Sequence, residues 1–236
     1  MNARQSHLYL ILLCLFIAVT VSAEKKGSLY RYIQNTSFEK YEELVEFTGD
    51  KLLLVDIRIY ALNRLVDLYF SVNVGLVMSN HGKEEIFKAV QGAALVFRKD
   101  KGPYNEFQLR QAACDALALF DGEKGGASIE TMRNVILTDP HRGVIKACID
   151  SLGKMVLHRE NASVSLKDFV HTILTKKEIS LEENFLVKAS LGSLSELNLQ
   201  SSFKLYLEVL RADAAFSVKR EAHMSLKKMD WASDNS

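Results

Sequence analysis

One twelve-residue stretch, Leu109 to Phe120, most constrains the fold, because variants of it recur along the chain. Its sequence, LRQAACDALALF, has a branched apolar residue at Leu109, a basic residue at Arg110, a small residue at Ala113 and a leucine at Leu117. Positions i, i+4 and i+8 lie on one face of an α-helix. A helix of this pattern therefore presents an apolar stripe that narrows at the small residue, where a second helix can approach closely.

The pattern returns in four other segments. Two of them, DIRIYALNRLVDL and SVKREAHMSLKKM, keep all four places, whereas in the other two the basic residue is displaced. The matching residues are Ile57, Arg58, Ala61 and Leu65; Val144, Lys146, Cys148 and Leu152; Leu186, Lys188, Ser190 and Leu194; and Val218, Lys219, Ala222 and Leu226. Successive leucines lie 52, 35, 42 and 32 residues apart. Two-helix units of about 40 residues stack into a solenoid, since one pair cannot bury its own apolar face.

The segments between these helices have helical polarity too, which predicts antiparallel helix pairs joined by short turns. The expected helices are 37–48 and 52–72; 83–98 and one that starts at Pro103; 127–137 and 144–156; 163–175 and one after Ser180; and 199–210 and one after Asp213. Asp50, Asp139, Ser180 and Asp213 are the expected N-caps.

The second helix of each unit resembles that of HEAT repeats of the degenerate bacterial type, with Asp, a branched residue and a base, then Ala, then Leu. The resemblance covers residues 24–230 and implies an all-α superhelix, a solenoid of about five antiparallel helix pairs, before a short flexible tail at 231–236. The long interval from Leu65 to Leu117 departs from a standard unit and leaves room for an inserted helix or a sixth unit. The alternative is a plain helical bundle around one closed core.

The first 23 residues have the pattern of a signal peptide. Arg4 is the positive residue, Leu8 to Val19 form the apolar run, and Val21-Ser22-Ala23 provide small residues before the cut. Alternatives are an uncleaved anchor, for which the run is short of about 20 residues, and a lipoprotein, which the Leu13-Cys14 order disfavours. We therefore expect export to the periplasm or the medium, with no stable membrane span after cleavage.

Export permits disulfides, and loss of Cys14 leaves Cys114 and Cys148. They fall on neighbouring repeat helices, whose axes are expected about 8–10 Å apart, whereas a disulfide needs Cα atoms within about 7 Å. The spacing therefore favours free, buried thiols, and a disulfide is the alternative.

Composition and motifs argue against several functions. Without Arg4 the chain has 29 basic and 29 acidic residues, which disfavours nucleic acid as a partner. No His pair has the helical spacing of a metal site, and no nucleophile or phosphate-loop motif is complete, so we expect no enzyme, metal or cofactor. Some HEAT-like proteins resemble bilin lyases, an alternative that the leader opposes. A purely structural envelope component is the third possibility.

The remaining candidate is a surface. In HEAT-like solenoids the second helices line the inner face, which implies a protein-binding or scaffolding role for their non-core residues. These are Arg64, Gln111, Asp115, Lys146, Asp150, Lys188, Lys219, Arg220 and His223. The last unit is the more basic one, so the choice there is between a solvated end face and a groove for an acidic segment of a protein partner.

Overall fold

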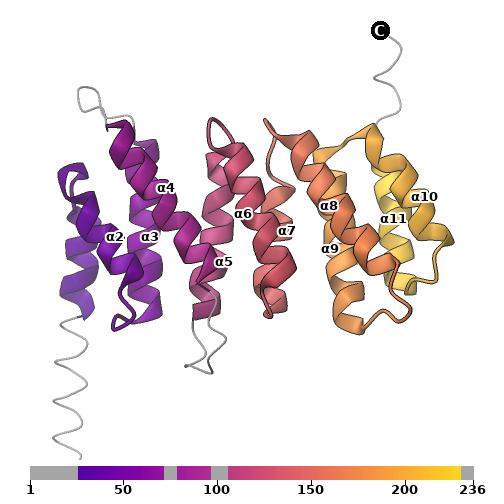
Figure 1. Ribbon diagram of the computed structural model, residues 1–236, viewed down its shortest axis with the longest axis horizontal. Coiled ribbons are helices and arrows are strands. Elements are labelled where there is room, and N and C mark those ends of the chain that lie inside the picture. The colour runs from indigo at the N-terminus through magenta and orange to yellow at the C-terminus, as the bar shows by residue number, and fades with distance from the viewer. Residues whose placement is uncertain (1–25, 72–78, 97–105, 230–236) are drawn as a thin grey trace, which may run out of the picture. The chain divides into compact units, whose positions relative to one another are not determined.

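The computed structural model describes residues 26–71, 79–96 and 106–229 (Figure 1). In these ranges all regular secondary structure is helical and no strand occurs, so the all-α prediction is confirmed for them. None of their helices combines the length and the apolar character needed to cross a bilayer. The predicted leader, the tail at 231–236 and the helix start at Pro103 lie outside the described residues.

The chain divides into two compact units, Met1–Ile86 and Phe87–Ser236. The first contains a helix at 26–35, η1 (Phe38–Lys40), α2 (Tyr41–Gly49), α3 (Val55–Phe70) and the first turns of α4 (Asn80–Leu95). Helices α2 and α3 pack against each other. Arg58 of α3 is buried in this unit, and its Nε donates to the carbonyl oxygen of Thr48 at 3.0 Å.

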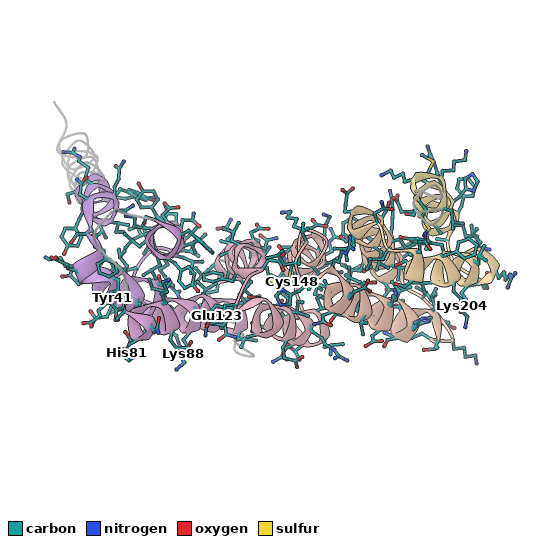
Figure 2. All side chains as sticks on the ribbon, turned by 90° about the horizontal axis from the view of Figure 1, so that it is seen from above. Tyr41, His81, Lys88, Glu123, Cys148 and Lys204 are labelled. Atoms are coloured by element: carbon teal, nitrogen blue, oxygen red, sulfur yellow. A yellow bond between two sulfur atoms is a disulfide. The ribbon has the colours of Figure 1, made fainter. Side chains whose placement is uncertain are left out.

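The second unit begins with the rest of α4 and continues as a series of helix pairs. Its elements are α5 (Glu106–Leu117), η2 (Ala118–Phe120), α6 (Gly125–Thr138), α7 (Arg142–Leu152), α8 (Arg159–Leu174), α9 (Leu181–Leu197), η3 (Gln200–Ser202), α10 (Phe203–Arg211) and α11 (Phe216–Lys228). Helix α5 contacts α7, α7 contacts α9 and α9 contacts α11, while α6, α8 and α10 pack against α7, α9 and α11, respectively. Figure 2 looks along the helices and shows two rows in this unit. We call α5, α7, α9 and α11 the inner row.

The repeated small residue lies inside the protein in every segment that carries the pattern. Ala61, Ala113, Cys148, Ser190 and Ala222 are all 0% exposed. Most of the repeated leucines are also fully buried, whereas Leu226, on the last described helix, is half-buried. Helices of the inner row therefore approach one another along the stripe that the sequence predicts.

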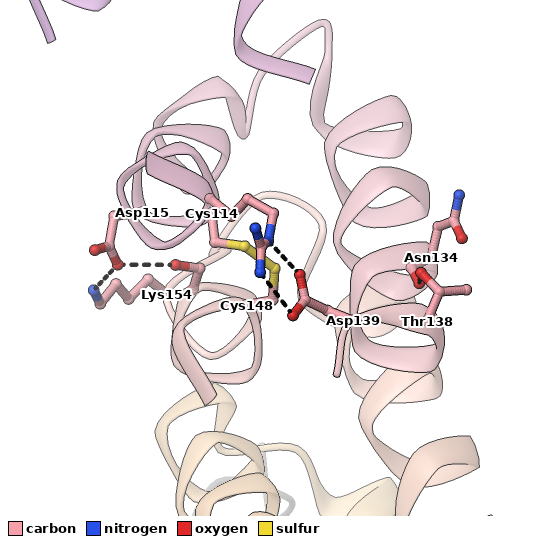
Figure 3. The surroundings of a disulfide bond; sticks show 9 residues. Cys114, Asp115, Asn134, Thr138, Asp139, Cys148 and Lys154 are labelled. Atoms are coloured by element: carbon pink, nitrogen blue, oxygen red, sulfur yellow. Dashed lines mark hydrogen bonds and ion pairs between the residues drawn. A yellow bond between two sulfur atoms is a disulfide. The ribbon is translucent and has the colours of Figure 1, made fainter. Parts of the chain in front are cut away.

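The basic residue of the pattern also turns inward in α5. The Arg110 side chain is 8% exposed and forms an ion pair with the Asp139 carboxylate, with Nε to Oδ2 at 2.5 Å and Nη2 to Oδ1 at 3.3 Å (Figure 3). Asp139 was expected to cap α7, but the N-cap is His141, whose N–H donates to Oδ1 of Asp139 at 2.8 Å. This carboxylate thus joins the turn before α7 to α5.

The other caps differ in outcome. Ser180 is the N-cap of α9, as predicted, and forms a capping box with Glu183. Asp50 and Asp213 were wrong predictions, because α3 begins after Leu54 and α11 after Ala215. Asp50 instead follows α2 and accepts the N–H of Leu52 at 2.8 Å, which stabilises the turn.

The expectation of free thiols is corrected by a disulfide between Cys114 and Cys148, whose Cα atoms are 4.9 Å apart (Figure 3). The error lay in comparing an axis separation with a Cα separation. Because Cα atoms lie about 2.3 Å from a helix axis, facing Cα atoms of helices about 9 Å apart come within about 5 Å. The cysteines meet where α5 and α7 face each other.

Candidate functional site: the α9 groove

An open groove of about 860 Å³ runs along α9 between α7 and α11. We call it the α9 groove. It is lined by Lys146, Asp150, Gly153, Lys154, Val156, Phe185, Lys188, Ala189, Gly192, Ser193, Glu196 and Glu221.

Helix α9 supplies the floor because one of its faces remains uncovered. Phe185, Lys188, Ala189, Gly192 and Glu196 follow one another at helical spacing, so they form a stripe along the helix. Ser190, next to Ala189, lies on the packed side and is fully buried. One side of α9 is therefore buried against other helices, and the other side is open to solvent.

A glycine allows α7 and α9 to come together at the edge of the groove. A Cβ atom on Gly153 would lie 2.8 Å from Cβ of Ser193 and 3.0 Å from its Cα. No side chain fits at Gly153 without moving one of the two helices. The close approach fixes how the lining residues of α7 lie beside those of α9.

The charges of the groove are partly paired. Lys146 forms an ion pair with Asp150 one turn along α7. Lys154 is 3.9 Å from Asp115, a contact between two exposed side chains (Figure 3). Within the described residues no ion pair involves Lys188, Glu196 or Glu221. These three charged groups are therefore available to a ligand.

Two apolar side chains lie exposed at the groove. Phe185, in the second turn of α9, is 44% exposed, and Val156, after α7, is 71% exposed. Aromatic side chains such as Phe185 are enriched at protein-binding surfaces.

The structure brings together three of the nine predicted inner-face residues, Lys146, Asp150 and Lys188. Asp115 lies nearby, because it also accepts a hydrogen bond from Ser151 Oγ at 3.3 Å. Gln111 instead packs over Gly143, where a Cβ atom would lie 2.7 Å from its Nε2.

The other four predicted residues lie elsewhere. Arg64 belongs to the first unit, where it donates to the carbonyl oxygen of Thr36 at 3.1 Å. Lys219, Arg220 and His223 are on α11, which contributes Glu221 rather than these residues to the groove. Arg220 and His223 are exposed, and Lys219 is half-buried.

The sequence interpretation missed Phe185, Gly192, Glu196 and Glu221. A helical wheel for α9 that started from Lys188 would have found Phe185, Gly192 and Glu196, which lie three or four residues apart on the same face. Glu221 comes from a different repeat, so only the packing of α11 on α9 brings it here.

In the part of the chain that the structure describes, no group of three or more His, Cys, Asp or Glu residues is arranged to hold a metal ion. No protein-family model matches this chain, and no curated protein matches it either.

Proposed function

We propose that this chain is a non-catalytic, exported HEAT-like repeat protein that binds another protein, and that the α9 groove is its docking surface. The observation that carries the proposal is the groove itself. It combines the exposed side chain of Phe185 with three open charged groups on a row of packed helices.

The order of packing supports a helical-repeat architecture for the second unit. Successive pairs contact their neighbours, and the inner row continues from α5 to α11. Small residues recur at the buried stripe, and Arg58 and Arg110 occupy the same place in the pattern and are both buried. These features favour stacked HEAT-like pairs over a bundle that closes around one core.

Two features support export. The first is the apolar leader that ends at Ala23. The second is the disulfide between Cys114 and Cys148, which persists in oxidising compartments and is rare in the cytosol.

Crosslinking with mass spectrometry in the native compartment tests the proposal. We expect an amine-reactive reagent to link a partner protein mainly to Lys146, Lys154 and Lys188 of the groove. Lys204, on α10 of the other row, is the internal comparison (Figure 2). Links to a partner through Lys204 but never through the groove lysines would contradict the proposal.

A matched pair of variants tests the same surface by affinity. Phe185→Ser removes the exposed apolar side chain of the groove, and Phe216→Ser makes the same change at an exposed position of α11 that does not line the groove. We expect Phe185→Ser to reduce recovery of the crosslinked partner and Phe216→Ser to leave it unchanged. Equal recovery from both variants would count against docking in the groove.

A further inference from the structure

We propose that the occupant of the α9 groove is an extended segment of the partner that carries an apolar residue and, about four residues away, a lysine or arginine. The inference rests on the proposed function and specifies the chemistry of the partner. It differs from the acidic segment that the basic last repeat suggests.

The carboxylates of Glu196 and Glu221, which lie near Gly192, determine the charge of the occupant. An atom at the Cβ position of Gly192 would lie 3.8 Å from Oε1 of Glu221, so this carboxylate stands beside a stretch of helix without a side chain. Glu196 follows Gly192 by one turn of α9 and is exposed. No described ion pair neutralises either carboxylate, and a basic side chain over Gly192 would contact both.

The end of the groove near Phe185 accounts for the apolar residue of the partner segment. Phe185 is 44% exposed there, and Lys188 lies one turn further along α9. An apolar side chain covers the phenyl ring, whereas a basic one would be repelled by Lys188. The two ends of the groove therefore select different side chains, which also fixes the orientation of the segment.

The rise of the helix gives the spacing. Phe185 and the interval from Gly192 to Glu196 are separated by about 10–16 Å at about 1.5 Å per residue. An extended chain advances about 3.3 Å per residue and presents alternate side chains on one side. Side chains four residues apart, about 13 Å, lie on the same side and match this distance.

A random peptide library displayed on phage tests the inference with the full, disulfide-bonded chain. We expect the wild-type protein to enrich peptides with Lys or Arg about four residues from an apolar residue. Glu196→Gln/Glu221→Gln removes both carboxylate charges and should abolish that preference. Glu130→Gln, at an exposed position of α6, is the matched control and should keep it.

A selected peptide then gives the affinity. Replacement of its basic residue by methionine should weaken binding to the wild-type chain about tenfold or more, as expected for the loss of one charge-assisted contact. The same replacement should have little effect on binding to Glu196→Gln/Glu221→Gln.

The outcomes separate this inference from the proposed function. Peptides that Phe185→Ser weakens, but that show no basic preference or an acidic one, would overturn the inference and leave the groove as a docking surface. Peptides insensitive to both sets of groove variants, or no enriched peptide at all, would overturn both.

Discussion

Arg110 and Asp139 form the most deeply buried ion pair described in the second unit, with side chains 8% and 3% exposed. Their charges are far from water, so each depends on the other for compensation. The pair joins α5 to the turn before α7, across 29 residues of sequence.

Asp139→Asn keeps the shape of this side chain and removes its charge. We expect the free energy of unfolding, measured by urea denaturation, to fall by about 3–5 kcal/mol, because Arg110 is left as an uncompensated buried charge. Asp168→Asn is the matched control, since Asp168 pairs with Arg133 at 3.4 Å between half-exposed side chains. It should cost less than about 1 kcal/mol. Similar losses in both variants would contradict the stabilising role of Asp139.

The residues of this pair also mark a limit of sequence reasoning. The pattern identified Arg110 and Asp139 as positions that matter, but it assigned Asp139 to a local cap. A local window contains the turn and the following helix, whereas the partner of Asp139 comes from the preceding pair. Ser180 was predicted correctly because its capping box is a local arrangement, completed by Glu183 three residues on.

Among the helices, α9 has an N-terminus that is stabilised by side-chain contacts in its first turn. Glu183 accepts hydrogen bonds from the Lys176 side chain and from the N–H of Ser180, and the Ser180 hydroxyl accepts the N–H of Glu183. These contacts, that of Lys176 first, lower the pKa of Glu183 from its ordinary value of 4.5 to about 2. The carboxylate form is therefore favoured in the folded protein.

The lowered pKa predicts a pH dependence. The contribution of Glu183 to the free energy of unfolding is present above about pH 4.5 and is lost as the pH falls through about 2. Glu183→Gln should therefore make the free energy of unfolding less dependent on pH in this interval, as measured by urea denaturation at several pH values. Glu182→Gln, at the preceding residue of the same helix, is the control. An unchanged pH dependence in Glu183→Gln would contradict the cap.

The groove shows which parts of an element a sequence can predict. Lys188 was selected as a non-core residue of α9, and it lines the groove. Gly192 was not selected, because a small residue on a helix suggests close packing and open space equally well. The helices and their buried faces followed from the repeated pattern, since burial imposes it, whereas the groove depends on where the neighbouring helices leave α9 uncovered.

In the molecule as a whole, two successive helix pairs are joined by a covalent link as well as by packing. The disulfide from Cys114 to Cys148 joins α5 to α7 across 34 residues. Along α5, Cys114 lies one helical turn from Arg110, which forms the buried ion pair. Two buried links of different chemistry thus connect α5 to α7 and to the turn that precedes it.

Removal of the disulfide should lower the free energy of unfolding by about 2–4 kcal/mol, because the unfolded chain regains the freedom of the closed loop. Cys114→Ala/Cys148→Ala and dithiothreitol treatment of the wild-type chain should give similar losses in urea denaturation. Dithiothreitol should not affect the double variant. An oxidised and a reduced chain of equal stability would show that the link does not hold α5 to α7.

One side of α9 packs within the inner row, while the adjacent side lines the open groove. Ser190 and Ala189 are adjacent, and only Ser190 is fully buried. The most direct measurement compares Ser190→Leu with Ala189→Leu by urea denaturation. We expect Ser190→Leu to lower the free energy of unfolding by about 1–3 kcal/mol through overpacking, whereas Ala189→Leu should change it by less than about 0.5 kcal/mol. Equal losses in the two variants, or a larger loss in Ala189→Leu, would contradict this division of α9 into a packed and an open side.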